Sequence, residues 1–465
     1  MALKFYNTLT KRLEEFYTIN PGEVRMYTCG PTVYDYAHIG NFRTYIFEDL
    51  LRRYLKYKGF RVVQVMNITD VDDKTIRRSR EEGVSLEDYT SRYTEAFFED
   101  IDTLRIEHAE FYPRATEHID DMVALIQKLI KNGYAYQLQG SWYYDVSKFK
   151  EYGKLSGVKL DELKPGARVS ADEYTKDEVH DFALWKAYTP DDGDVFWETA
   201  LGRGRPGWHI ECSAMSTRYL GNHFDIHTGG VDNIFPHHEN EIAQSEAATG
   251  EKFVNFWLHS AYLIVEGEKM SKSKGNFYTL RDILKRGYDP VVVRYLLLSS
   301  HYRQQLNFTF SGLDAAKSAL SRIWDFIDNL KRIESNLSHN PEVDTIIEAA
   351  SSGFITSLDD DLNISGALGV LFDFIRGINR LISSDSLGRD DARLVLEKLS
   401  DFNRVLDIFP QGSEPLEDWV LEMIKKRDRA RKSRDWETAD RIRDELRKKG
   451  IILEDTPKGT IWKKR

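Results

Sequence analysis

The order of hydrophobic and polar positions predicts an α/β arrangement near the N-terminus. Residues 23–28 have the pattern of a short strand, and apolar positions at helical spacing over residues 42–58 indicate a helix that Gly59 ends. Residues 62–68 form a second apolar run. A strand, a helix and a strand in this order make a βαβ unit, and ligands of such sheets bind beyond the carboxyl ends of the strands.

The pattern changes twice further along the chain. From about residue 115 a helix, short strands and polar turns indicate an insertion between two halves of the sheet domain. Apolar residues at helical spacing return over residues 312–406 and predict a helical bundle. After a short linker, two helices over residues 418–432 and 435–449 precede a hairpin, and Trp436 is assigned to the buried face of the second helix.

Length and composition exclude several classes of protein. At 465 residues the chain exceeds one ordinary core, which predicts several domains. No run approaches the roughly 18 apolar residues that cross a bilayer, and the N-terminus lacks an apolar secretory segment. Two cysteines do not make a disulfide scaffold, so we expect a cytoplasmic protein without a membrane partner.

The charge is distributed unevenly. The net charge is -10, but residues 424–465 hold 16 Lys and Arg against 8 Asp and Glu, a local charge of +8 that leaves -18 for the other 423 residues. A basic tail on an acidic body indicates a module that binds a polyanion such as nucleic acid.

Four side chains have the chemistry of metal ligands. Pro236 suits the first position of a helix, on which His237 and Glu241, four residues apart, would face the same point. With Cys29 and Cys212 they would complete a set of zinc ligand types. The alternative is that His237 caps a helix, Glu241 is solvated and both cysteines are small buried hydrophobes.

Two polar segments have residue types that bind phosphate. His38 and Gly40 stand at the start of the predicted helix, where free N–H groups attract an anion and glycine lets a phosphate or an adenine approach. Residues 269–276 place three lysines in a loop with serine and glycine, and such lysines can reach a polyphosphate. A solvated basic loop is the alternative for the second segment.

Five motifs in sequence order carry a resemblance over nearly the whole chain. They are residues 29–35 with 38–41, 67–74, 207–215, 235–241 and 269–273. Together they resemble the cysteinyl-tRNA synthetases, a family of class I aminoacyl-tRNA synthetases. The resemblance implies an α/β fold: a class I Rossmann-like parallel-sheet catalytic domain with an inserted connective domain, followed by an α-helical bundle and a small α+β anticodon-binding domain.

The resemblance also implies domain boundaries. The first half of the catalytic domain is expected at residues 1–115, the connective insertion at 116–200 and the second half at 201–265. The lysine-loop and stem-contact region is expected at residues 266–312. The helical bundle is expected at residues 313–408 and the basic anticodon-binding domain at 409–465. The insertion is smaller than the editing domain that several related synthetases carry.

The implied reaction is the ATP-dependent joining of L-cysteine to tRNA(Cys), with one zinc ion per chain selecting the cysteine thiolate. By resemblance the zinc ligands are Cys29, Cys212, His237 and Glu241. The phosphate and pyrophosphate contacts, with Mg²⁺, are His38, Gly40, Asn41, Lys269 and Lys272. The nucleoside contacts are Gly230 and Asp232, and the neighbours of the amino acid are Gly30, Thr69 and Trp208.

The basic tail is expected to contact the anticodon of tRNA(Cys). Asp455 could accept hydrogen bonds from a guanine edge, although it could equally cap a turn. Trp462 could stack on a base or close a small core. Arg427 is the first of a series of arginines expected to contact the tRNA backbone. We expect the protein to act as a monomer.

The chain departs from the family pattern at a few positions. Thr228 stands where glycine is common, and Asn233 and Lys274 stand where leucine is common. Two rival functions stay open: a ligase that joins activated cysteine to an aminosugar, as in mycothiol biosynthesis, and a synthetase relative that only binds RNA. The basic tail favours tRNA over the aminosugar, and the intact motifs favour catalysis.

Overall fold

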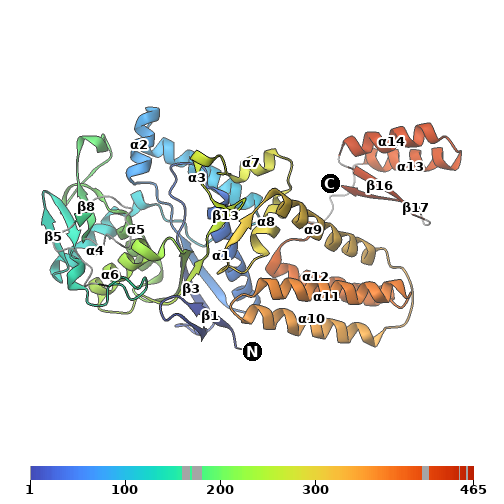
Figure 1. The fold of residues 1–465 in the computed structure, drawn as a ribbon, viewed down its shortest axis with the longest axis horizontal. Coiled ribbons are helices and arrows are strands. Elements are labelled where there is room, and N and C mark those ends of the chain that lie inside the picture. The colour runs from blue at the N-terminus through green and yellow to red at the C-terminus, as the bar shows by residue number, and fades with distance from the viewer. Residues whose placement is uncertain are drawn as a thin grey trace. The chain divides into compact units, whose positions relative to one another are not determined.

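The computed structural model describes residues 2–159, 168–169, 181–410, 418–449, 451–456 and 459–464. The chain forms two compact units, residues 1–408 and 409–465 (Figure 1). Much of the turn-rich segment expected over residues 153–177 lies outside the described residues. Within the described ranges, none of the helices combines the length and the apolar composition that a membrane crossing requires.

A four-stranded parallel sheet lies at the centre of the larger unit. Its order is β12 (Val254–Ser260), β11 (Phe224–Gly230), β3 (Glu23–Thr28) and β4 (Arg61–Met66). Helix α1 (Ile39–Tyr57) joins β3 to β4, which confirms the predicted βαβ unit and the α/β class. Every residue of β12 is buried, as is usual for parallel strands covered on both faces.

Helix α1 begins at Ile39, three residues earlier than predicted, because two side chains cap it. The backbone N–H of Asn41 donates to Nδ1 of His38 at 3.2 Å, and the N–H of His38 donates to Oδ1 of Asn41 at 3.0 Å. This reciprocal arrangement satisfies two donors of the first turn. This first turn lies before the repeating apolar positions, so hydrophobic periodicity does not reveal it.

The insertion contains a helix and a second sheet. Its helix is α4 (Ile119–Lys131), and its strands follow the order β5 (Ala135–Leu138), β6 (Ser141–Tyr144), β8 (Asp181–Ala187), β10 (Gly202–Pro206) and β9 (Trp197–Thr199), with β7 (Arg168–Val169) beside β8. Helix α5 (Trp208–Leu220) then leads back to β11, and α6 (Glu239–Thr249) joins β11 to β12.

Shorter elements complete the sheet domain. They are the hairpin of β1 (Lys4–Asn7) and β2 (Arg12–Glu15), helices α2 (Asp73–Glu82), α3 (Leu86–Thr103), α7 (Leu280–Lys285) and α8 (Pro290–Leu298), and a small sheet of β14 (Glu268–Lys269), β13 (Leu263–Val265) and β15 (Leu306–Phe308). The loop with the three lysines follows β14.

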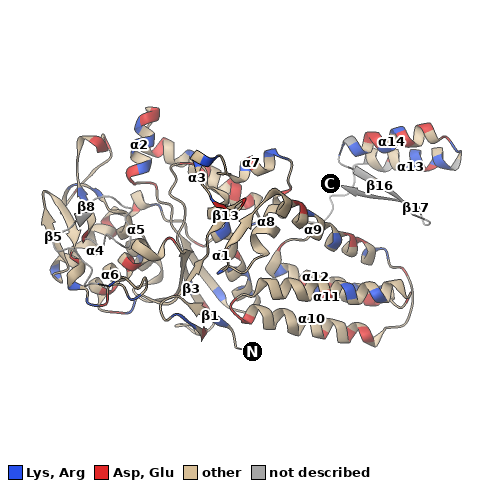
Figure 2. Ribbon diagram, in the orientation of Figure 1, with Lys and Arg blue, Asp and Glu red and all other residues tan. Residues whose placement is uncertain are grey.

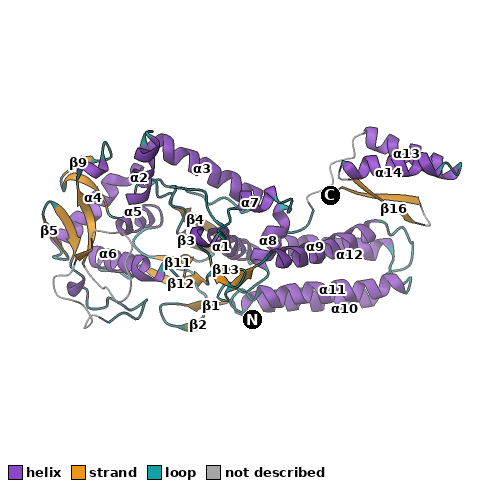
Figure 3. Cartoon of the chain, turned by 45° about the horizontal axis from the view of Figure 1, so that its top comes forward, coloured by secondary structure: helices purple, strands orange, loops and turns teal. Residues whose placement is uncertain are grey.

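The predicted helical bundle is present as four helices. They are α9 (Phe310–Lys331), α10 (Pro341–Asp359), α11 (Ile364–Ser383) and α12 (Arg389–Leu406) (Figure 3). Their apolar stripes face one another; Leu371, Ile378 and Phe402, for example, are fully buried. Because these stripes are filled by the bundle itself, they serve as its core.

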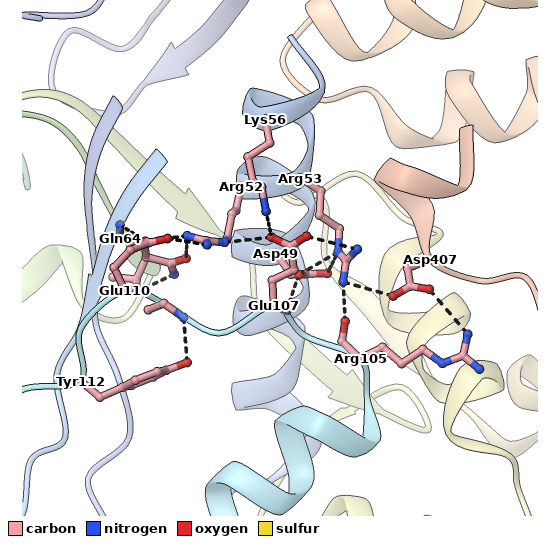
Figure 4. A network of polar contacts seen from close by, with 12 residues as sticks. Asp49, Arg52, Arg53, Lys56, Gln64, Arg105, Glu107, Glu110, Tyr112 and Asp407 are labelled. Carbon is pink, nitrogen blue, oxygen red and sulfur yellow. Dashed lines mark hydrogen bonds and ion pairs between the residues drawn. The ribbon is translucent and has the colours of Figure 1, made fainter. Parts of the chain in front are cut away.

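Polar contacts join α1 to the end of the bundle, and Figure 4 shows Arg53 of α1 beside Asp407, which follows α12. Asp49 of α1 lies 2.8 Å from Nε of Arg53 and 2.5 Å from Nη2 of Arg294, and Arg294 also donates to the carbonyl oxygen of Leu406 at the end of α12. Burial alone would raise the pKa of Asp49, but the two guanidinium groups outweigh burial and hold this pKa below its ordinary value. These contacts hold α1 against α8 and the end of α12.

The smaller unit consists of α13 (Asp418–Lys432), α14 (Trp436–Lys448) and the hairpin of β16 (Ile451–Thr456) and β17 (Gly459–Lys464). Acidic side chains stand among the basic ones on both helices (Figure 2). The expectation that Trp436 is buried was wrong, since its side chain is 58% exposed. It is the first residue of α14, at the connecting turn, whereas the core lies deeper, between Ile424 and Leu446.

Candidate active site

A cavity of about 470 Å³ lies at the carboxyl ends of the central strands. Its lining includes Cys29 and Gly30, which follow β3, and Gly230 and Ser260, which end β11 and β12. Its lining also includes His38, Gly40, Asn41, Asp232 and Lys269. The volume and the position suit a nucleotide, because open parallel sheets bind ligands at this edge.

Four predicted side chains meet beside this cavity. Cys29, Cys212, His237 and Glu241 can each present a ligand atom such that all four atoms lie within 4.8 Å of one another. Cys212 lies on α5 and Glu241 on α6, so the four side chains come from separate parts of the chain. Three of them are fully buried and Cys29 is partly exposed.

The chemistry of these donors fits a divalent cation. Oε1 of Glu241 is buried and accepts no hydrogen bond from the described residues, although it lies 3.1 Å from Nε2 of His237. Burial raises the pKa of Glu241, while His227 and His237 oppose this rise. Two thiols and a carboxylate in a buried space favour a bound cation, and their ligand types are those of zinc.

A second set of donors shares two members of the first. His227 and His238 form with Cys29 and Glu241 another group whose ligand atoms lie within 4.8 Å of one another. Nε2 of His238 is 3.2 Å from the sulfur of Cys29, and Nε2 of His227 is 3.0 Å from Oε2 of Glu241. The sequence analysis missed this set, although His238 adjoins His237; spacing alone does not reveal that β11 brings His227 to the same point.

The local structure around His237 agrees with the predicted start of the helix. Phe235 is extended (φ -138°, ψ 132°), and because it precedes Pro236 it interrupts the wide turn of residues 234–238 before the proline. His238 is helical (φ -69°, ψ -31°) and leads into α6, which is regular from Glu239. His237 and Glu241 meet because residues 236–238 continue directly into α6.

Two of the three residues predicted beside the amino acid, Gly30 and Thr69, belong to one network. The N–H of Gly30 donates to Oδ1 of Asn67 at 2.9 Å, the amide of Asn67 donates to Thr69, and the hydroxyl of Thr69 donates to Glu211 at 3.1 Å. A Cβ atom on Gly30 would lie 1.8 Å from the backbone oxygen of Asn67, so glycine is required there. The sequence analysis did not assign Asn67 or Glu211.

Trp208 lies against the cluster of four donors. Its ring stacks on the ring of His237, with centroids 4.3 Å apart and an angle of 22° between the planes. The following residue, His209, places its Nδ1 2.9 Å from Nδ1 of His237. These two side chains of α5 therefore fix the orientation of the imidazole of His237.

The residues predicted to contact phosphate combine a neutral imidazole with lysines. Burial lowers the pKa of His38 to about 4, so the ring is neutral at pH 7. Nδ1 accepts the N–H of Asn41, so Nε2 carries the proton and can donate it in a hydrogen bond. Lys269 lines the cavity, and Nζ of Lys272 lies 2.6 Å from Oδ2 of Asp35.

Gly230 and Asp232 lie together at the end of β11. A Cβ atom on Gly230 would be 2.3 Å from Oδ1 of Asp232, so a side chain at this position would displace the carboxylate. Both residues line the cavity, as do Gly40 and Met270. Met270 limits the space beside Gly40. The residues predicted for the nucleoside and the start of α1 thus line the same cavity.

The residues predicted to contact the anticodon lie in the smaller unit. Asp455 and Trp462 fall in β16 and β17, but their side chains lie outside what the structure describes. Arg427 of α13 is only 2% exposed, which leaves little of it available to a phosphate. Several other arginines of this unit are exposed: Arg429, Arg434, Arg441, Arg443 and Arg447.

Glu239, a residue that the sequence analysis did not assign, fastens the insertion to α6. Its buried carboxylate accepts the backbone N–H groups of Gly153 (2.9 Å), Leu155 (3.2 Å) and Ser156 (2.7 Å). In Glu239→Gln an amide would replace one of the two acceptor oxygens and face donors. We expect a loss of about 2–4 kcal/mol of unfolding free energy, measured by urea denaturation.

The matched control for this variant is Glu246→Gln on the same helix. Glu246 pairs with Lys154 of the same segment, but that pair is partly exposed, so its loss should cost less than about 1 kcal/mol. Equal losses in the two variants would show that Glu239 does not fasten the insertion.

Comparisons with known proteins define the class. Residues 15–318 match the family model of the class I (C) tRNA synthetase catalytic domain, residues 353–410 a DALR domain, and residues 416–462 the cysteinyl-tRNA ligase anticodon binding domain. The structure of Mycobacterium tuberculosis methionyl-tRNA synthetase in complex with methionyl-adenylate is similar in fold, with a TM-score of 0.61, 15% identity, and coverage of 82% of this chain and 89% of that chain. The fold is that of a class I aminoacyl-tRNA synthetase.

Curated relatives define the family. The cysteine–tRNA ligase of Brachyspira hyodysenteriae is 52% identical over 471 residues, which cover 99% of each chain. That of Chlamydia muridarum is 51% identical over 476 residues, which cover 100% of each chain. The chain belongs to the cysteine–tRNA ligase family, and the resemblance predicted from its motifs is confirmed.

Proposed function

We propose that this chain joins L-cysteine to the 3′ end of tRNA(Cys), with ATP as the second substrate. The observation that carries the proposal is the meeting of Cys29, Cys212, His237 and Glu241 beside the 470 Å³ cavity. When bound by these four side chains, a zinc ion would bind the thiolate of the substrate and so distinguish cysteine from serine and alanine.

The residues of the cavity have separate tasks in the first step. Gly30, Thr69 and Trp208 hold the amino acid with its carboxylate toward the cavity. A carboxylate oxygen then forms a bond to the α-phosphorus of ATP, the bond from that phosphorus to the bridging oxygen breaks, and pyrophosphate leaves with Mg²⁺. No side chain forms a covalent bond, because this kind of transfer needs positioning and charge neutralisation.

Phosphate contacts come from both sides of the cavity. His38 donates through Nε2, Asn41 lies one turn further along α1, and Lys269 and Lys272 neutralise the charge that develops on the leaving pyrophosphate. Gly40, Gly230 and Asp232 bind the nucleoside. In the second step a ribose hydroxyl of the tRNA attacks the carbonyl carbon of the adenylate, and AMP leaves.

The smaller unit is the proposed anticodon reader, with its exposed arginines on the tRNA backbone. Asp455 and Trp462 remain the candidates for base contacts, and Arg427 would support the fold more than it contacts phosphate, since it is buried. A chain that ends at residue 410 should keep cysteine-dependent pyrophosphate exchange within about twofold and lose at least roughly tenfold in kcat/KM for charging. Pyrophosphate exchange is the internal control, and unchanged charging would deny this unit its role.

The test of the whole proposal is the charging of total tRNA with labelled cysteine, ATP and Mg²⁺. Transfer of label to tRNA, with weak competition by serine, is expected. Cysteine-dependent pyrophosphate exchange without charging would point instead to a ligase for an aminosugar, and failure of both reactions would point to an RNA binder.

A monomeric state and a cytoplasmic location are parts of the same proposal. Free thiols as metal ligands need a reducing compartment, which supports the cytoplasm. Size-exclusion chromatography with light scattering tests the first part.

A further inference from the structure

Helix α1 carries a buried carboxyl group that the proposed reaction does not use. Glu48 is 1% exposed, and its Oε1 accepts a hydrogen bond of 2.7 Å from the hydroxyl of Thr228 in β11. Oε2 is also buried and has no hydrogen-bond partner among the described residues. Burying a carboxyl group costs free energy unless hydrogen bonds compensate for it, and the hydroxyl of Thr228 provides this compensation.

The pair joins α1 to β11, and both elements contribute residues to the lining of the cavity. Glu48 is one helical turn beyond Thr44, which lines the cavity and places its Oγ1 2.7 Å from Oγ of Ser260 at the end of β12. Thr228 immediately precedes Gly229 and Gly230, which also line the cavity. The two contacts, one turn apart, seat the same face of α1 on the ends of β11 and β12.

The sequence supplies this hydrogen bond through an unusual residue. Thr228 stands in a segment where the motif resemblance leads one to expect glycine, and glycine has no hydroxyl to donate. Burial raises the pKa of Glu48 to about 8, although the hydrogen bond from Thr228 opposes this rise. At pH 7 the group is therefore mostly an uncharged acid, which acts as a hydrogen-bonding partner and not as a counter-ion.

We propose that Glu48 and Thr228 are a positioning pair, whose hydrogen bond fixes α1 along β11 and so sets the spacing of the cavity walls for ATP. The inference rests on the proposed function in taking this cavity as the ATP site. His38, Gly40 and Asn41 lie at the start of α1, and Gly230 and Asp232 lie at the end of β11 or just beyond it. A shift of the helix along the strand would therefore separate groups that bind the same nucleotide.

The first test is the Thr228→Val variant, which keeps the shape of the side chain and removes the hydroxyl. In cysteine-dependent pyrophosphate exchange the KM for ATP should rise roughly three- to tenfold, as expected for one lost hydrogen bond. The KM for cysteine should stay within about twofold, because Thr228 is none of the four proposed metal ligands and the substitution leaves its backbone unchanged. The single variants Thr228→Ser and Glu48→Gln keep the donor and the acceptor, so each should have a KM for ATP close to that of the unchanged protein.

A matched control is Thr94→Val in α3. Thr94 is buried, and its hydroxyl donates to the carbonyl oxygen of Thr90 within the same helix at 2.8 Å. This control should leave both KM values unchanged. If Thr228→Val, like the control, leaves the KM for ATP unchanged or lowers only the fraction of active protein, the positioning role is wrong.

The double variant Glu48→Met/Thr228→Val separates positioning from stability. With both polar groups removed, thermal stability should return close to that of the unchanged protein, whereas the KM for ATP should stay raised. A KM that recovers together with stability would overturn the proposal. Asp232→Ala tests the cavity itself: if it raises the KM for ATP and Thr228→Val does not, only the pair is wrong, and if neither raises it, both proposals fall.

Discussion

The Cys212→Ser variant is expected to purify without zinc and to lose cysteine activation while it still binds ATP. Cys212 is buried on α5, and its sulfur belongs to the group of donors within 4.8 Å of one another. A serine hydroxyl stays protonated at neutral pH and binds zinc poorly. Because loss of an outer partner of a metal ligand already costs about 10–100-fold, loss of a ligand should lower cysteine-dependent pyrophosphate exchange at least roughly 100-fold.

Elemental analysis of the purified protein measures the metal, and one zinc per chain is expected before the substitution. The best control uses the second set of donors. His238→Asn removes a donor of the second set only, whereas His237→Asn removes a donor of the first set only. Zinc retained in His238→Asn and lost in His237→Asn would assign the first set, and the reverse result would assign the second. Full activity of Cys212→Ser would contradict both the site and its role.

The βαβ unit could be predicted because its signals are local. The strand pattern of β3, the helical repeat of α1 and the apolar run of β4 follow one another, and a parallel sheet brings the ends of its strands to one edge. The motifs after β3 and before α1 were therefore expected at one site. The bundle was predictable for the same reason, since its apolar stripes keep the helical period.

Contacts between distant segments could not be predicted in this way. The bond between Glu48 and Thr228 joins residues 180 positions apart, and neither residue type indicates the other. Glu239 bonds to a segment 83–86 positions earlier in the chain through backbone groups, which leave no trace in the sequence. Local spacing misled at Trp436, because helical spacing does not show where the partner helix ends.

The Lys272→Ala variant is expected to slow adenylate formation about 100–1,000-fold, the range found when one group that stabilises a developing charge is removed. Lys272 is exposed in the loop after β14, and its ammonium lies 2.6 Å from Asp35 of the motif that follows β3. The charge on the pyrophosphate grows as it leaves, so the loss should fall on the rate of this step. The KM for cysteine should change by less than about threefold, because Lys272 lies outside the four-donor cluster.

Lys274→Ala is the matched control, because Lys274 lies on the same turn as Lys272. Nζ of Lys274 is 2.8 Å from Oε2 of Glu268 in the adjoining strand, whereas Nζ of Lys272 contacts Oδ2 of Asp35 in the segment that follows β3. Single-turnover measurement of adenylate formation with labelled ATP should therefore show a change of less than about threefold for Lys274→Ala. Equal losses in the two variants would mean that only the net charge of the loop matters, and an unchanged rate in Lys272→Ala would remove this lysine from the mechanism.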